Sequence, residues 1–115
     1  SFSAVSPALT GEFTDLHEYN LTNTANYDEY LFSFARWNNK EKLIVISNFS
    51  AGNNYRFKLQ IPAELITEWR LADGRYQLSE VLSNDIHDFI IEGGKARIEV
   101  ELASLESKVF HFKTR

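Results

Sequence analysis

The stretch YLFSFARWNNKEKLIVISNF, residues 30–49, predicts the β-hairpin that decides the fold. Both arms, YLFSFARW and KLIVISNF, are rich in aromatic and β-branched residues, and the polar NNKE between them suits a turn. A strand with one face in water should alternate, but the second arm is apolar at almost every position. Its apolar side chains divide between two faces: Leu43, Val45 and Phe49 on one, Ile44 and Ile46 on the other. Both faces require cover, so we expect the outer surface of the domain to pack against a neighbour that these residues do not include.

Length and composition indicate one globular domain. A chain of 115 residues, 43% of them hydrophobic, can bury roughly two-thirds of its unfolded surface without disulfides. The net charge of −4 and the scattered Lys and Arg argue against a nucleic-acid partner. The chain has no cysteine, which excludes a disulfide framework, a thiolate metal site and a cysteine nucleophile. No apolar run approaches the roughly 18 residues that cross a bilayer, so no membrane partner is expected.

The remainder of the chain predicts further short strands separated by turns. Alternation is clear in residues 55–61, where Tyr55, Phe57, Leu59 and Ile61 share one face, and again in residues 96–102. Strands are also expected at residues 75–82, 88–92 and 108–113, with turn signals at 73–74 and 93–94. A strand is favoured over a short helix for residues 11–19, residues 20–28 indicate a loop, and residues 63–71 fit either a helical turn or an edge strand. Seven or eight short strands with almost no helix predict an all-β, antiparallel two-sheet Greek-key sandwich.

Two clusters of acidic residues and histidine are candidates for acid–base chemistry: Asp15, His17 and Glu18, and Asp85, His87 and Asp88. Such chemistry needs two groups held across a cleft, whereas both clusters fall at predicted strand ends or loops. We therefore interpret them as solvated turn residues. No metal-ligand spacing connects the three histidines, His17, His87 and His111, so no metal site is predicted. No catalytic residue or cofactor is expected either, because the G-x-S-x-G motif is missing and Gly93-Gly94 indicates a hairpin turn.

The sixteen aromatic residues leave one ligand hypothesis, a carbohydrate-binding surface. Sugar rings stack on flat, exposed aromatic faces, and the candidates near predicted turns are Trp37 and Trp69, with Tyr27 and Tyr76. The alternative is that Phe and Tyr fill the core while each Trp covers an edge or a domain contact. The sequence favours this structural alternative over a sugar-binding one.

Three stretches resemble domain C, the C-terminal β-sandwich of α-amylase-family glycoside hydrolases. SPALTGEF, residues 6–13, resembles the "ALxxGxF/Y" phrase by which the family passes from the last barrel helix into the sandwich. Residues 30–37 resemble the "FAFxR" strand, with Phe32, Phe34 and Arg36 in register, and KLIVISNFS, residues 42–50, resembles "LLVVxNFS". Residues 1–10 are then expected to be a leader from a preceding barrel element, and residues 11–115 the domain itself.

The resemblance implies a non-catalytic domain that packs on and stabilises a catalytic (β/α)8 barrel of the same parent chain. The family's catalytic Asp, Glu and Asp lie on that barrel, so none is carried over to this sequence. The residues expected to pack between domains are Leu43, Ile44, Val45 and Ile46. An α-glucan-binding module using Trp37 and Trp69 is the alternative, and self-association through the apolar strand is a third. An exported bacterial parent is one interpretation of the Asn-rich, cysteine-free composition.

Overall fold

The computed structural model describes residues 12–38 and 40–113 of the chain. The leader expected at residues 1–10 lies outside the described residues. Two short helices and eight strands follow one another along this part of the chain: β1 (Glu12–Asp15), α2 (His17–Asn23), β2 (Leu31–Trp37), β3 (Glu41–Asn48), β4 (Tyr55–Ile61), α3 (Ala63–Glu68), β5 (Gly74–Glu80), β6 (Ile86–Glu92), β7 (Lys95–Leu102) and β8 (Ser107–Lys113). Neither helix has the length and apolar character needed to cross a membrane.

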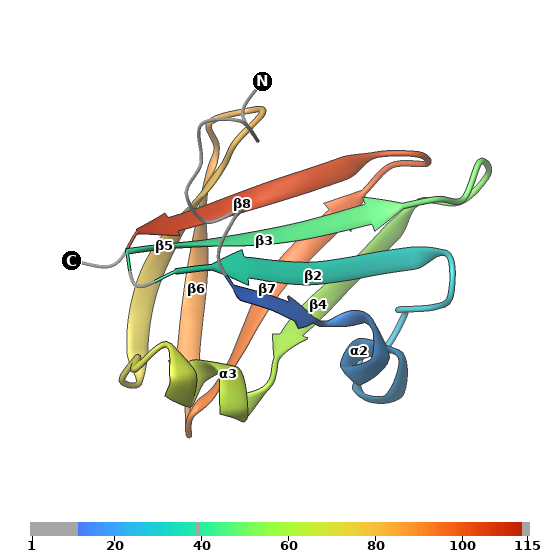
Figure 1. The fold of residues 1–115 in the computed structure, drawn as a ribbon. Helices are drawn as coiled ribbons and strands as arrows, with labels where there is room; N and C mark the ends of the chain where they lie inside the picture. Colours follow the sequence, from blue (N-terminus) through green and yellow to red (C-terminus); the bar gives the residue numbers. More distant parts are fainter. Residues whose placement is uncertain (1–11, 39, 114–115) are drawn as a thin grey trace.

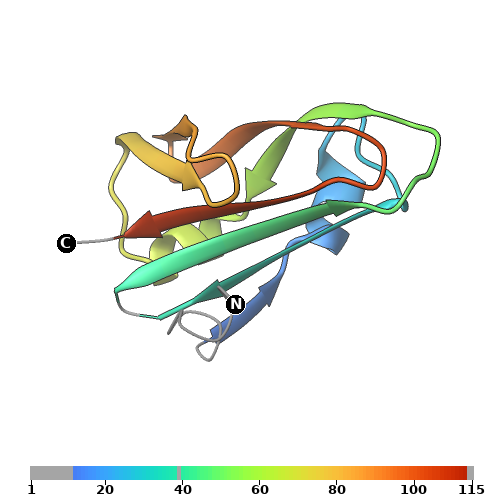
Figure 2. The ribbon, with the colours of Figure 1, turned by 90° about the horizontal axis from the view of Figure 1, so that it is seen from above.

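All eight strands belong to one antiparallel sheet in the order β1-β2-β3-β8-β5-β6-β7-β4. The sheet curls so that the half formed by β1, β2, β3 and β8 faces the half formed by β5, β6, β7 and β4 (Figures 1 and 2). Ser79 pairs with His111 and Glu80 with Phe110 where the two halves meet, and the Val81 N–H donates to the Val109 carbonyl (2.8 Å) just beyond them. The all-β class, the antiparallel pairing and the number of strands are therefore confirmed. The two-sheet Greek-key arrangement is not confirmed, because β5 pairs with both β6 and β8 and the ladder continues around the corner.

The hydrophobic core lies between the two halves and is built by alternate residues of each strand. The alternation predicted for residues 55–61 and 96–102 is confirmed: every second side chain of β7 is buried, and on β4 Phe57, Leu59 and Ile61 are buried while Tyr55 is half-buried. The fully buried large side chains of the core include Leu31, Ile44, Ile46, Leu59, Ile61, Leu78, Phe89, Ile91 and Phe110. The predicted β2–β3 hairpin is also confirmed, with Leu31 opposite Asn48 and Trp37 opposite Lys42.

The strand favoured for residues 11–19 is correct only for Glu12–Asp15, and α2 replaces the start of the predicted loop. The reason is tertiary and centres on Asn20, which is completely buried. Its Nδ2 donates to the carbonyls of Leu16 (2.8 Å) and Gln60 (3.0 Å), while its Oδ1 accepts from the Gln60 N–H (2.8 Å). One amide side chain thus supplies the strand partner that the edge of β4 lacks, and it holds α2 against that edge.

Residues 63–71 contain the helix α3, which begins after Pro62 and ends before Trp69. Pro62 accepts the first helical hydrogen bonds through its carbonyl, from Leu65 (3.0 Å) and Ile66 (3.2 Å). Leu65 and Ile66 are buried, so α3 closes one end of the space between the halves. The helical alternative for this segment is therefore correct.

The predicted turn at Gly93-Gly94 joins β6 to β7, and both glycines have positive φ, 60° and 75°. The carboxylate of Asp73 accepts hydrogen bonds from both backbone N–H groups, at 2.9 and 3.0 Å. These two hydrogen bonds hold the turn against the start of β5, so the two glycines have a structural role.

Candidate functional site

The middle of the strand β2 has its aromatic side chains on the outside and its small ones in the core. Ser33 and Ala35 point inward and are fully buried, although they are the smallest residues of the strand. Phe32 and Phe34 point outward, and Phe32 is 37% exposed. Tyr30 continues this alternation just before the strand and is 51% exposed. A strand with one face in water is expected to hold polar residues at its outward positions, so two outward Phe rings are unusual.

Further aromatic rings extend this surface onto the neighbouring strands. Phe13 of β1 stacks on Phe34 with ring centroids 5.4 Å apart and 29° between planes, and Phe34 lies 5.8 Å from Phe32. Phe49 follows β3 and donates its N–H to the Tyr30 carbonyl (2.8 Å), which pairs these two residues at the open end of the hairpin. The outer aromatic face is defined by five residues: Phe13, Tyr30, Phe32, Phe34 and Phe49. Of these, Phe13 is 49% and Phe49 65% exposed.

One end of the outer aromatic face carries a cation. The guanidinium carbon of Arg36 lies 5.0 Å from the centre of the Phe13 ring. Arg36 is also the cross-strand partner of Phe13 and Leu43, so it continues the outward series of β2 across three strands. A cation over a ring adds electrostatic attraction to the stacking of the row and helps to fix the position of Phe13.

The inward Ser33 makes room for Tyr27, which lies below the outer aromatic face and is 6% exposed. The Tyr27 hydroxyl is hydrogen-bonded to Ser33 Oγ (2.9 Å) and to His17 Nδ1 (3.0 Å). Burial raises the pKa of Tyr27 to about 12, although the hydrogen bond from Ser33 acts in the opposite direction. The His17 ring also lies 5.5 Å from Phe32, so this buried chain supports the face from beneath.

The two candidate acid–base clusters, interpreted from the sequence as solvated turn residues, make structural contacts in the fold. Asp15 Oδ2 accepts the N–H of Glu18 (3.2 Å) at the start of α2, while His17 is bound to Tyr27. In the second cluster, His87 packs edge-on against Phe110 with ring centroids 5.1 Å apart.

The third histidine, His111, pairs with Glu41, with 2.7 Å between Nε2 and Oε2. His111 lies opposite Leu43, on the face of β3 and β8 that is turned away from the core-facing Ile44. Among the described residues, no group of three or more His, Asp or Glu is placed to hold a metal ion.

The four residues predicted to pack between domains lie on the central strand β3. Ile44 and Ile46 point into the core, and Leu43, on the opposite side, is also fully buried within this chain. Only Val45 is half-exposed, between Phe34 of β2 and Val109 of β8. The chain itself therefore covers three of the four, so a missing neighbour is not what makes β3 apolar on both sides. Inter-domain packing through this strand stays a prediction, and Val45 is its accessible part.

The two tryptophans predicted to stack on sugars lie against each other. Trp69 is 5% exposed and meets Trp37 edge-on, with ring centroids 6.3 Å apart. Trp37 is half-buried and its Nε1 donates to Thr14 Oγ1 (3.3 Å). Tyr76 is also half-buried, and its hydroxyl donates to the Ala72 carbonyl (2.7 Å). Trp69 offers no accessible ring face, so the sugar-stacking prediction depends on Trp37 and on rings that the sequence did not single out.

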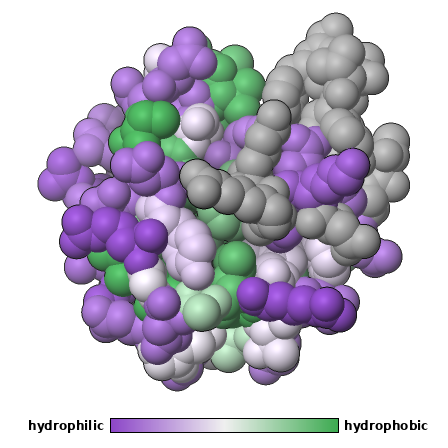
Figure 3. Space-filling model, turned by 90° about the vertical axis from the view of Figure 1, so that its left-hand side faces the viewer, coloured by the Kyte–Doolittle hydropathy of each residue, from purple (hydrophilic) through white to green (hydrophobic). Residues whose placement is uncertain are grey.

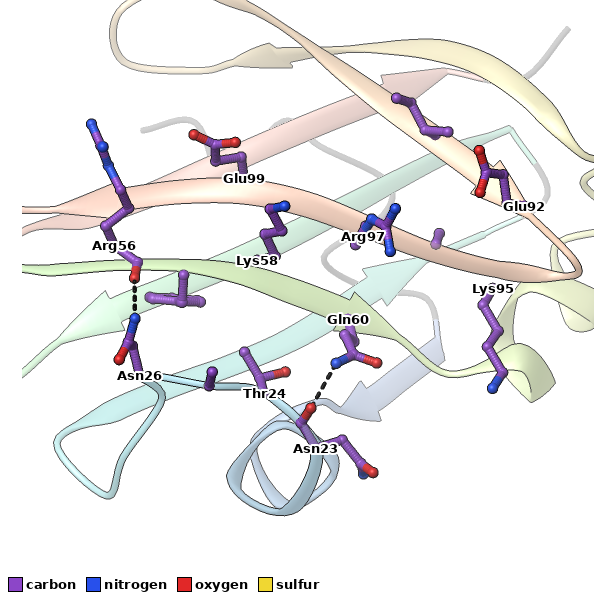
Figure 4. Close-up of a pocket in the computed structure, with 14 residues that line it drawn as sticks. Asn23, Thr24, Asn26, Arg56, Lys58, Gln60, Glu92, Lys95, Arg97 and Glu99 are labelled. Atoms are coloured by element: carbon purple, nitrogen blue, oxygen red, sulfur yellow. Dashed lines mark hydrogen bonds between the residues drawn. The ribbon is translucent and has the colours of Figure 1, made fainter.

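The outer side of the other half of the sheet is charged. Arg56 and Glu101 form a 2.9 Å ion pair across β4 and β7, and Lys58 stands opposite Glu99. A hollow of about 650 Å³ lies between these strands and the loop after α2 (Figure 4). Gln60 spans one wall of it, donating from Nε2 to the Asn23 carbonyl at 2.7 Å. The end of the molecule that carries β5 shows small hydrophobic groups scattered among hydrophilic ones (Figure 3).

The outer aromatic face is the functional candidate that the sequence reasoning missed. A signal was available, because YLFSFARW places Tyr30, Phe32 and Phe34 in one register of the strand. The apolar run of β3 led to the prediction that the second arm of the hairpin packs against a neighbour, whereas the exposed apolar surface lies mainly on the first arm.

No protein-family model and no curated protein matches the sequence. Solved structures do match, among them an AmyP variant in complex with maltotriose, with a TM-score of 0.55 and 19% identity. AmyP in complex with maltose matches with a TM-score of 0.53 and 21% identity. Each match covers 94% of this chain but 18% of the AmyP chain. AmyP is an α-amylase-family enzyme, so the resemblance drawn from the sequence is confirmed as a likeness of fold to a small part of such an enzyme.

Proposed function

We propose that this chain is a non-catalytic accessory domain of an α-amylase-like glycoside hydrolase. In this proposal it is the C-terminal domain, residues 11–115, and it packs on and stabilises a catalytic (β/α)8 barrel of the same parent. The observation that carries the proposal is the match of nearly the whole chain to 18% of AmyP. A fold that forms a small part of an amylase, with acidic and histidine clusters held in structural contacts, fits a supporting role.

The outer aromatic face gives this role a physical basis. Interfaces between domains of one chain bury about 600–1,500 Å². Removing apolar area from water contributes about 25 cal/mol per Å², so an interface of this size can add materially to the stability of the barrel. The half-exposed rings of β1 and β2 are the available apolar area.

Deleting the domain from its parent enzyme tests the proposal. We expect the thermal midpoint of the catalytic domain to fall by several degrees, while kcat at low temperature is largely retained. The matched control is the intact parent under the same conditions. An unchanged thermal midpoint after deletion, or a parent without a barrel preceding this domain, would refute the stabilising role.

A second candidate is an α-glucan-binding module, which the exposure of Tyr30 and Phe49 favours. Both rings are more than half exposed and lie near Asp28, whose carboxylate accepts the Tyr55 hydroxyl (2.8 Å). Isothermal titration of this chain with maltotriose tests it, with a Tyr30→Ala, Phe49→Ala variant as the control. Heat of binding that the variant loses would support the module, and no heat up to millimolar sugar would rule it out.

A further inference from the structure

We infer that the outer aromatic face is the surface on which the catalytic domain of the same parent docks. This inference rests on the proposed function and deepens it, because it names the contact surface and its chemistry. The partner surface is expected to be apolar and to belong to the barrel, and Phe13, Phe32 and Phe34 form the centre of the contact.

The first argument is the outward position of two Phe rings on β2. Phe32 and Phe34 lie on the outer face, while the inward positions between Leu31 and Trp37 hold the small Ser33 and Ala35. Each aromatic side chain can bury about 150–250 Å². A ring that stays at the surface of the domain therefore contributes little hydrophobic stabilisation to the fold. A partner that covers the face removes this disadvantage, and large exposed apolar patches mark such contacts.

The second argument is that the face is already assembled. Phe13, Phe34 and Phe32 contact one another in a row, and His17 and Tyr27 support the row from beneath. Side chains that are held before contact lose less conformational freedom when a partner binds. The rings of Phe13 and Phe32 remain 49% and 37% exposed, so part of each is free to enter a pocket on another surface.

The third argument selects the occupant. In AmyP the matched fold is 18% of the chain, so most of that polypeptide lies outside it. In the proposed parent the barrel precedes this domain, and β1, the first of the described strands, carries Phe13. A partner in the same chain is present at high effective concentration, so it would occupy the face before a second copy does. The Phe rings also have no polar atom to offer a sugar hydroxyl, which favours a protein over a glucan.

Variants of the parent enzyme test the inference. Phe13→Ser with Phe32→Ser is expected to lower the thermal midpoint of the catalytic domain by nearly as much as deleting this domain. The matched control is Leu21→Ser with Leu105→Ser, two exposed apolar residues outside the face (40% and 65% exposed), which should leave the midpoint within error. If deletion destabilises the barrel but the Phe variant behaves like the control, the docking surface is wrong and the proposed function stands. If deletion has no effect, the proposed function fails as well.

A measurement without substitutions guards against a variant that fails to fold. Hydroxyl-radical footprinting of the unmodified parent and of this 115-residue chain compares the oxidation of peptides containing Phe13, Phe32 and Phe49. We expect several-fold slower oxidation of these peptides in the parent, and equal rates for the peptide that contains Lys58 on the charged side. Equal rates for the Phe peptides would overturn the inference. Protection in this chain alone that rises with its concentration would assign the face to a second copy instead and would also overturn it.

Discussion

The two halves of the curled sheet share a core but present different outer surfaces. On the half with β1, β2, β3 and β8, outward positions hold stacked Phe rings and Val45, with Arg36 and the Glu41–His111 pair beside them. On the half with β5, β6, β7 and β4, the outer side of β4 and β7 holds charged residues that include the ion pair of Arg56 with Glu101, while β6 exposes Ile86. Both outer surfaces belong to one ladder, so strand pairing alone does not account for the difference.

The comparison shows that the residue types on the outer face of a sheet indicate whether that face contacts water or another protein surface. Charged side chains in cross-strand pairs remain hydrated and add little to stability, which suits a surface in contact with water. Stacked rings gain only when water is removed from them. The charged half therefore indicates a solvent-facing surface, and the aromatic half indicates one that is suited to burial.

The largest expected effect separates the inner from the outer side of the aromatic half. Phe110→Ala should lower the free energy of unfolding by about 3–5 kcal/mol, because Phe110 is 1% exposed and its removal leaves a cavity. Phe32→Ala on the outer side should lower it by no more than about 1–2 kcal/mol, since this ring is already partly in water. Urea unfolding of both variants checks the difference. Equal losses would mean that the outer row is part of the core of this chain.

A smaller effect is expected at the edge of the charged half, where Asn20 binds Gln60. Asn20→Ala should lower the free energy of unfolding by about 3 kcal/mol, because the backbone N–H and C=O of Gln60 both lose their partner and a fully buried amide is removed. Asn23→Ala is the matched control, since the Asn23 side chain is exposed and bonds only within α2, to the Tyr19 carbonyl. A loss at Asn20 no greater than at Asn23 would show that the edge of β4 does not need this amide.

The pH dependence of stability should report the buried tyrosine under the aromatic half. Unfolded tyrosine releases its proton near pH 10, whereas Tyr27 in the fold holds it until about pH 12. Between these values the unfolded state binds fewer protons, so stability is fully present below pH 10 and falls by about 2 kcal/mol as pH rises to 12. Urea midpoints across this window should fall less steeply for Tyr27→Phe. Identical slopes for the two proteins would contradict a raised pKa.

The smallest expected effect is at the ion pair on the charged half. Arg56 and Glu101 side chains are 71% and 66% exposed, so water and salt screen their attraction. Arg56→Ala should leave the urea midpoint within measurement error at physiological salt. A clear loss of stability would show that this surface is shielded from solvent, and the contrast between the two halves would then disappear.

Most of the strands could be predicted from the sequence, because residue alternation and turn residues act locally. Residues 55–61 and 96–102 alternate so clearly that their inward faces could be read directly. The helix at residues 17–23 could not, since it depends on hydrogen bonds from Asn20 to Gln60, forty residues away. The outer aromatic face was legible in YLFSFARW but was overlooked in favour of its more apolar partner strand.

The sequence by itself determined the all-β class, the hairpin at residues 30–49 and the resemblance to an amylase domain. Local propensity and period-two patterning suffice for these features. Only the tertiary structure decided that one sheet curls on itself, that Trp69 is buried, and that Leu43, Ile44 and Ile46 are covered by this chain. The physical reason is that the burial of a residue depends on which strands become its neighbours. The strand β3 lies between β2, which is next to it in sequence, and β8, which is remote from it in sequence, and local patterning does not specify the remote neighbour.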